Sequence, residues 1–75
     1  MERYRDIDGD SGVAAYEIGA DYIRVQFKDS SLYLYTYASA GSHNIEQMKK
    51  LAAAGDGLNA FINRNVRKAY ERKER

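Results

Sequence analysis

Leu32-Tyr33-Leu34-Tyr35-Thr36-Tyr37 is the stretch that decides the fold of this chain. Its aromatic and β-branched content suits a half-buried pleated surface, so we predict a strand. Just before it, positions 23–28 alternate apolar and polar side chains, which is the two-residue period of a second strand. A turn at 29–31 connects the two, and a shorter strand at 13–18 precedes them. The pattern predicts a three-stranded antiparallel β-meander.

Two helices are predicted after this meander. Ser42 or Asn44 is expected to cap the first helix, and Gly55 to end it in a left-handed conformation. Asp56 is expected to cap the second helix, whose apolar stripe runs from Leu58 to Ala69. The expected fold class is therefore α+β, with the two α-helices packed on one face of the meander.

The chain has 75 residues, which is enough for one domain. We place the domain at residues 13–72, between a flexible polar arm at 1–12 and a charged tail at 73–75. A domain this small buries only about 60% of the surface of its unfolded chain, so its stability is expected to be slim. No apolar run is long enough for a signal peptide or a membrane span, and we expect no membrane partner.

Charge is unevenly placed along the chain. The net charge is +1, but residues up to Gly57 carry a balance of −3 and residues from Leu58 onward a balance of +4. The near-neutral total argues against a strongly basic nucleic-acid-binding protein, whereas the positive C-terminal part leaves a local basic surface open. There is no cysteine, so disulfides and thiolate metal sites are excluded, and a cytoplasmic location is the default expectation.

Several short motifs occur together between Ser11 and Tyr70. They are Tyr33-Leu34-Tyr35, the preceding Ile23-x-Val25-x-Phe27, and the glycine-led helix with Phe61-Ile62-Asn63-Arg64-Asn65-Val66-Arg67. In this order the chain resembles the KTSC domain family, which is named for its occurrence at the C-terminus of some lysyl-tRNA synthetases and is also found as stand-alone bacterial proteins. It departs from the family pattern at Ser30, where the turn usually carries glycine, and at 38–42, where a Val-Pro usually follows the tyrosines. The resemblance implies RNA binding as a suggestion.

The length of the turn after Phe27 decides where the tyrosines point. A two-residue turn at 29–30 pairs Val25 with Leu34 and exposes Tyr33, Tyr35 and Tyr37 as a platform that can stack bases. A three-residue loop at 28–30 pairs Val25 with Tyr33 and places the tyrosines under the helices. We favour the core arrangement, because buried tyrosines with solvated hydroxyl groups are common in small cores.

The second helix carries most of the remaining candidates. Its basic side chains can follow phosphates, although charged runs on helices are more often only solvated and cations also suit the negative end of a helix dipole. Asn65, at the edge of the apolar stripe, is expected to bond a buried backbone group, whereas Asn63 is the better surface candidate. The full set of nucleic-acid-binding candidates is Arg24, Tyr33, Tyr35, Asn63, Arg64, Arg67, Lys68 and Arg72.

A competing pattern lies in the arm. Asp6, Asp8, Asp10 and Glu17 have the spacing of calcium ligands in an EF-hand loop. However, Ser11 stands where the loop needs glycine, five residues cannot form an entering helix, and Glu17 falls inside the expected first strand. We interpret the likeness as accidental, with weak calcium binding as the alternative, and we assign no metal site.

Catalysis is not expected. His43 is the single histidine and no serine lies in a nucleophile motif, so triads, zinc sites and phosphate loops lack their parts. No cofactor and no small-molecule substrate is inferred. Two functions remain from the sequence. The first is a nucleic-acid-binding module with RNA as its partner, which the basic helix and the tyrosine-rich strand indicate. The alternative is a protein-interaction or self-association module that docks a protein or a second copy.

Overall fold

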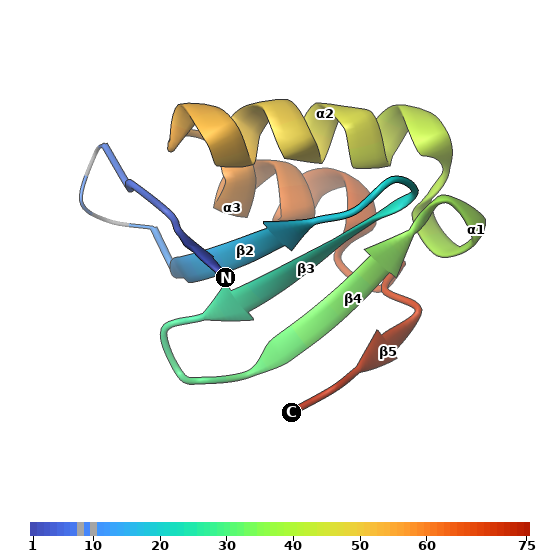
Figure 1. The fold of residues 1–75 in the computed structure, drawn as a ribbon, viewed down its shortest axis with the longest axis horizontal. Helices are drawn as coiled ribbons and strands as arrows, with labels where there is room; N and C mark the ends of the chain where they lie inside the picture. Colours follow the sequence, from blue (N-terminus) through green and yellow to red (C-terminus); the bar gives the residue numbers. More distant parts are fainter. Residues whose placement is uncertain (8, 10) are drawn as a thin grey trace.

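The computed structural model describes residues 1–7, 9 and 11–75, which form one antiparallel sheet covered by helices (Figure 1). The sheet has the order β1-β2-β3-β4-β5, so every strand pairs with its neighbour in the chain. Its strands are β1 (Glu2–Arg3), β2 (Val13–Ile18), β3 (Tyr22–Phe27), β4 (Leu32–Thr36) and β5 (Arg72–Lys73). The helical segments are α1 (Tyr37–Ala40), α2 (Ser42–Ala54), α3 (Leu58–Phe61) and the π-helical η1 (Ile62–Val66), which continues α3.

The α+β class is confirmed, and the three central strands are those that the sequence predicts. The sheet is larger than a three-stranded meander because β1 and β5 extend it at both edges. β1 comes from the expected arm, where the Tyr4 ring is only 3% exposed and the Ile7 N–H donates to the Gly55 carbonyl. The buried ring of Tyr4 thus anchors the otherwise polar N-terminal segment to the rest of the fold. Residues 1–7 therefore belong to the folded domain.

The β3–β4 hairpin has the longer of the two possible loops. Val25 lies opposite Tyr33 and Ile23 opposite Tyr35, so the register of the core arrangement is confirmed. Tyr35 is buried, whereas Tyr33 is half-buried. The loop spans 28–30, closed by the Ser31 carbonyl accepting from the Phe27 N–H, and Ser30 has a φ of 73°. Tyr37 behaves differently, because the strand ends at Thr36 and Tyr37 begins α1 with an exposed side chain.

Helix α2 covers the core face of the sheet with Ile45, Met48 and Ala52. Gly55 ends it in the left-handed conformation with a φ of 73°, as predicted. The predicted start was wrong, since Gly41 occupies the N-cap position and neither Ser42 nor Asn44 caps the helix. The last turn before Gly41 is instead the short α1, which Thr36 and Ser39 cap reciprocally.

The second predicted helix is shorter than expected. Gly57, not Asp56, holds its N-cap position with a φ of 81°, and regular helix ends at Val66. The chain then returns to the sheet, where the N–H groups of Glu71 and Glu74 donate to the carbonyls of Leu34 and Leu32. The C-terminal residues pair with the edge of β4 and do not continue the helix. Arg72 therefore lies in a strand and not on a basic helix.

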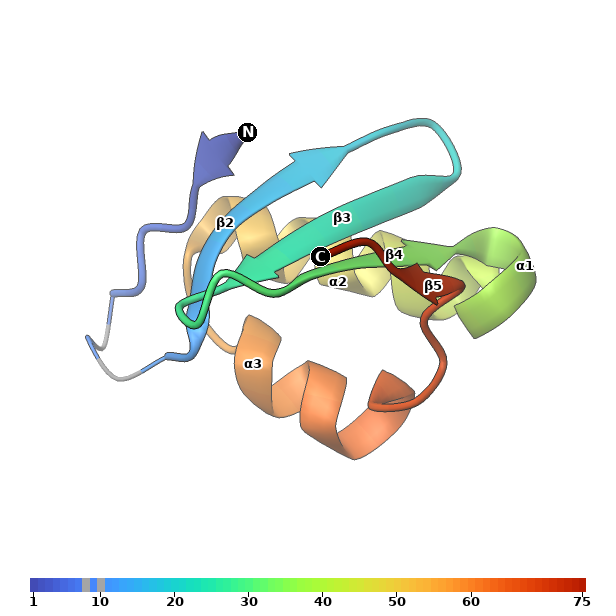
Figure 2. The same ribbon diagram turned by 90° about the horizontal axis from the view of Figure 1, so that it is seen from below.

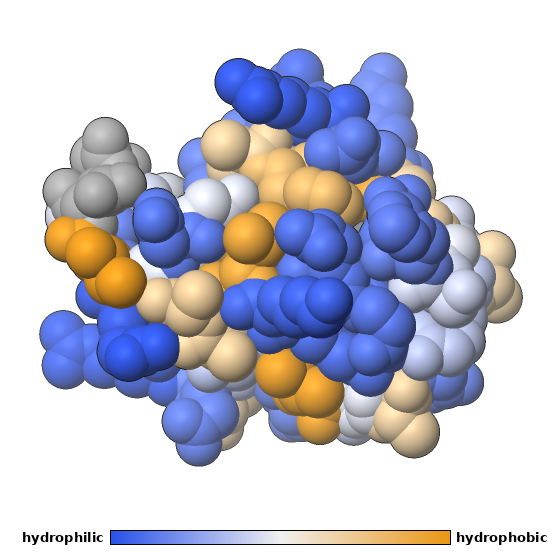
Figure 3. All heavy atoms as spheres, turned by 90° about the horizontal axis from the view of Figure 1, so that it is seen from above, coloured by the Kyte–Doolittle hydropathy of each residue, from blue (hydrophilic) through white to orange (hydrophobic). Residues whose placement is uncertain are grey.

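Both α2 and the α3–η1 segment lie on the same face of the sheet, and the C-terminal segment runs beside β4 (Figures 1 and 2). Seen from the helix side, hydrophilic side chains cover most of the surface and apolar ones form only small areas between them (Figure 3). No helix within the described residues is long and apolar enough to cross a membrane.

Candidate nucleic-acid interface

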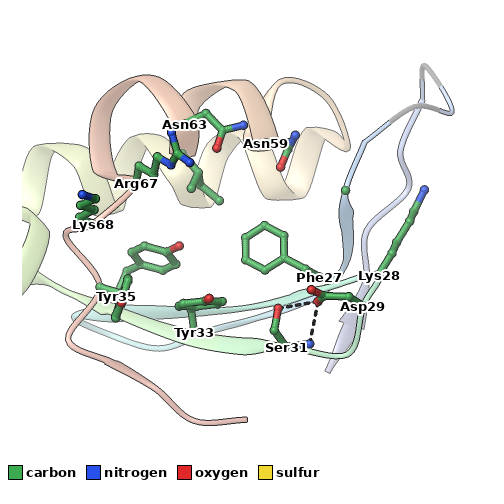
Figure 4. A pocket seen from close by; sticks show the side chains of 13 residues that line it. Phe27, Lys28, Asp29, Ser31, Tyr33, Tyr35, Asn59, Asn63, Arg67 and Lys68 are labelled. Carbon is green, nitrogen blue, oxygen red and sulfur yellow. Dashed lines mark hydrogen bonds between the residues drawn. The ribbon is translucent and has the colours of Figure 1, made fainter.

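A groove of about 560 Å³ lies between the α3–η1 segment and the end of the β3–β4 hairpin (Figure 4). Sheet side chains point into it from one wall and helix side chains from the other. It is lined by aromatic, amide and charged residues, namely Gly12, Phe27, Lys28, Asp29, Ser31, Tyr33, Tyr35, Asn59, Ile62, Asn63, Arg67, Lys68 and Tyr70. The groove therefore brings together five of the eight candidates, Tyr33, Tyr35, Asn63, Arg67 and Lys68.

The floor of the groove consists of aromatic rings. The hairpin register puts Phe27, Tyr33 and Tyr35 on the helix-facing side of the sheet. The Tyr33 ring packs edge to face on Phe27, with centroids 5.6 Å apart, and on Tyr70, with centroids 4.8 Å apart. Such offset and perpendicular pairs are favourable because ring edges are positive and ring faces negative. Tyr33 is thus held rigidly while remaining only half-buried.

Tyr35 lies beside Tyr33 on this floor, with ring centroids 6.5 Å apart. Its side chain is 2% exposed, and burial, together with the neighbouring Tyr33 and Tyr70, raises the pKa of its phenol far above the ordinary value. The ring therefore remains neutral at physiological pH. Tyr33 is the more exposed of the two rings, and Tyr35 is a core residue beside it.

Two asparagines form the polar part of the helical wall. Asn59 and Asn63 are four residues apart, so they lie one above the other on one side of the α3–η1 segment, facing the rings (Figure 4). Asn59 is half-buried and Asn63 exposed. The wider turn of η1 sets the position of Asn63, and π-helical turns are frequently found at functional sites.

Cations lie along the rim. Arg67 and Lys68 are exposed, and neither forms an ion pair with any residue of the described chain. The Lys73 ammonium lies 5.8 Å from the centre of the Tyr33 ring. At the hairpin end, Lys28 is engaged with Asp6 at 3.0 Å. Two cations without an ion-pair partner in the described chain therefore lie where the helix ends, at the rim of the groove.

One anion lies at the other end of the groove. The Asp29 carboxylate accepts hydrogen bonds from the Ser31 hydroxyl at 2.6 Å and the Ser31 N–H at 3.0 Å. These hydrogen bonds lower the pKa of Asp29, so it stays charged near neutral pH. A phosphate is consequently favoured at the Arg67 end of the groove and disfavoured at the hairpin end.

No family model, curated protein or solved structure matches this chain. The resemblance to the KTSC family therefore stays a prediction, which rests on Tyr33-Leu34-Tyr35 and the motifs around it. One detail of the fold is relevant to it: the turn residue at which that family usually has glycine, Ser30 here, adopts the left-handed conformation that glycine prefers.

The remaining three candidates lie outside the groove. Arg24 is on the opposite, open face of the sheet, where its guanidinium bonds Glu17 and Glu74 at 2.8 Å each. Arg72 bonds the same Glu74 at 3.0 Å. We call Glu17, Arg24, Glu74 and Arg72 the open-face ladder. Arg64 is exposed on η1 but does not line the groove.

Sequence reasoning did not assign Phe27, Asn59 or Tyr70 to a site. Phe27 and Tyr70 were noted only as parts of strand and helix motifs. The signal for Asn59 was its four-residue spacing from Asn63, which predicts one shared helix face. Asn65, expected to bond a buried group across the sheet, is instead exposed and donates to the Phe61 carbonyl within its own helix.

The calcium pattern is not assembled by the residues that the structure describes. Asp6 pairs with Lys28, which lowers the pKa of its carboxyl, and Glu17 lies in β2 and bonds Arg24. Asp8 and Asp10 lie outside the described residues. Within the described part, no group of three or more metal-ligating side chains comes together.

Proposed function

We propose that the groove binds single-stranded nucleic acid, with RNA as the first class to test. The observation that carries this proposal is the meeting, in one groove, of a half-buried aromatic ring, two asparagine amides and two cations that form no ion pair within the described chain. Each supplies one part of what an unpaired nucleotide needs. The ring stacks the base, the amides bond its edge, and the cations attract the phosphate.

The size of the groove favours an unpaired nucleotide over a duplex. Its volume of about 560 Å³ is in the range of sites for small organic ligands. A base can enter it and stack on Tyr33, whereas paired bases have their faces covered by neighbours. Arg67 and Lys68 lie next to each other at the end of η1, where a phosphate attached to the stacked nucleotide would meet positive charge.

Docking of a protein on the sheet is less well supported. Both edge strands are two residues long, which leaves little free edge for a partner strand. On the open face, the ladder residues already bond one another. A protein-interaction or self-association module is therefore an outcome of the test below and not the preferred function.

The test is a fluorescence-anisotropy titration of a labelled single-stranded RNA, repeated at increasing salt. Binding is expected at low salt and should weaken as salt rises, because bound phosphates release counterions. In Arg67→Gln/Lys68→Gln the salt dependence should fall by roughly 1.4 in the slope of log K against log salt, at about 0.7 per lost phosphate contact. Tyr33→Ala should weaken binding about 5- to 150-fold, the equivalent of one lost stacked base.

The matched control is Arg64→Gln/Arg72→Gln, which removes the same charge outside the groove. It should keep the slope of the wild type. An equal loss in both double variants would mean that net charge and not the groove attracts RNA. Absence of binding to single-stranded RNA at low salt would contradict the proposal, and sedimentation of the same sample would then show whether the chain self-associates.

A further inference from the structure

The four asparagines of the chain fall into two pairs with different surroundings. Asn44 and Asn65 each donate a side-chain N–H to the carbonyl four residues earlier, Asn44 to Ala40 at the end of α1 at 2.8 Å and Asn65 to Phe61 at 3.2 Å. This is the usual way in which a helical asparagine satisfies its amide. Asn59 and Asn63 do not follow it, and neither side chain bonds any group of the described chain. Both point into the groove (Figure 4).

No hydrogen bond within the described chain accounts for this second pair. Asparagine is a poor residue for a helix interior, costing about 0.5–0.7 kcal/mol relative to alanine. The α3–η1 segment carries this cost twice, at Asn59 and Asn63, which lie one turn apart on the groove wall opposite Phe27 and Tyr33. The two amides present two donor–acceptor pairs above an aromatic floor, and neither bonds a group of the described chain.

We infer that Asn59 and Asn63 together read the edges of one unpaired base and select adenine. This inference rests on the proposed nucleic-acid binding. A carboxamide offers one acceptor and one donor side by side. Adenine matches that pattern twice, because its amino group at N6 has a ring-nitrogen acceptor on each side, N7 and N1. Two amides can therefore each take one N6 hydrogen and donate to one ring nitrogen.

The other bases match the pair less completely. Guanine presents two acceptors, O6 and N7, on its Hoogsteen edge and would leave an amide oxygen facing an acceptor. Cytosine has an acceptor on only one side of its amino group, and uracil has no amino group. Arg67 and Lys68, the residue types that favour guanine, lie at the rim, where they are placed to meet phosphate instead.

The experiment compares four labelled RNA heptamers that differ only at the centre: seven uridines, or the same with a central adenosine, cytidine or guanosine. All share the same phosphates, so charge contributes equally. The wild-type chain is expected to bind the adenosine heptamer about tenfold more tightly than the others, the effect of one good hydrogen-bonded edge. In Asn59→Ala/Asn63→Ala this ratio should fall below about twofold, while the salt dependence of binding, which the phosphate contacts set, stays that of the wild type.

Asn65→Ala is the matched control, since it makes the same change on the same segment at an amide that is already bonded. It should keep the tenfold ratio. Equal affinities for all four heptamers, preference for another base, or a ratio that survives in Asn59→Ala/Asn63→Ala would each overturn the adenine inference and leave the nucleic-acid proposal standing. Failure to bind any heptamer would overturn both. Circular dichroism of each variant checks the fold, which alanine in a helix is expected to preserve.

Discussion

The arginines on the two faces of the sheet differ in their contacts with carboxylates. On the open face, Arg24 contacts two carboxylates and Arg72 contacts one of the same two. On the helix-covered face, Arg67 stands at the rim of a groove and pairs with no acid of the described chain. All three side chains count equally in the net charge of the sequence. Only the position of the nearest carboxylate separates a charge that holds the fold together from one that is free for a ligand.

The same contrast applies to the tyrosines of β4. Tyr33 and Tyr35 are two residues apart and point to the same side, yet Tyr35 is only 2% exposed whereas Tyr33 is half-buried on the floor of the groove. Position along the strand, and not residue type, separates the structural ring from the accessible one.

Tyr35→Ala should have the largest effect on stability. Removing a ring that is 2% exposed leaves a cavity in the core, and aromatic-to-alanine changes in cores cost about 3–5 kcal/mol. A domain of this length has a free energy of unfolding of only about 4–11 kcal/mol, so the variant should be partly or largely unfolded. Urea denaturation followed by circular dichroism measures the difference.

Tyr33→Ala is the comparison variant, since it removes the same side chain from the same strand and face. Its cost should stay below about 2 kcal/mol, because Tyr33 is half-buried and the space left opens onto the groove. Equal losses of stability in the two variants would show that the groove floor is as much a part of the core as Tyr35.

Arg24→Gln should have a smaller effect that depends on pH. The hydrogen bond from Arg24 is the largest cause of the lowered pKa of Glu74, and Arg72 lowers it by a smaller amount. A carboxyl with a lowered folded pKa contributes stability above its unfolded pKa, near 4.5, and loses it as pH falls through the folded value. Partly exposed pairs contribute little, so we expect a loss of at most about 1 kcal/mol at pH 7.

The measurement is the free energy of unfolding from pH 7 to pH 3 for wild type and Arg24→Gln. The two curves should differ most at neutral pH and converge in acid. Asp6, Asp29 and Glu46 also have lowered pKa values, and their share of the acid-side loss remains in both proteins. RNA affinity should be unchanged in Arg24→Gln, and a drop like that of the Arg67→Gln/Lys68→Gln variant would remove the distinction between the two faces.

Local pattern predicted the central part of this fold and missed its ends. The alternation at 23–28 and the tyrosine strand specify β3 and β4, and Gly55 specifies the end of α2, because each depends on neighbours in sequence. β1 and β5 are two residues each and exist only because a distant strand offers an edge. No local period could reveal them. The early end of the second helix has the same cause.

The site was predictable in part for the same reason. Asn63, Arg67 and Lys68 were found because helical spacing places them on one segment. Arg24 and Arg72 were chosen for their charge, but their carboxylate partner Glu74 is 50 residues away from Arg24 in sequence and meets it only through β5. Asn59 and Phe27 face each other across the groove, which again depends on the packing of helix on sheet.

Ser30→Gly should have the smallest effect, and in the opposite direction. Ser30 closes the β3–β4 hairpin with a φ of 73°, a conformation that glycine adopts without the penalty that a Cβ brings. Removing that penalty outweighs the extra freedom of glycine in the unfolded chain, so we expect a gain of about 0.5–1 kcal/mol in the free energy of unfolding. Gly41→Ala is the reverse control, because it adds a Cβ at a φ of 89° and should destabilise the protein.

Since the loop length sets the register that turns Tyr33 and Tyr35 toward the helices, Ser30→Gly should keep both the fold and the RNA affinity. A loss of stability in Ser30→Gly would mean that the loop does not have the conformation on which this register depends.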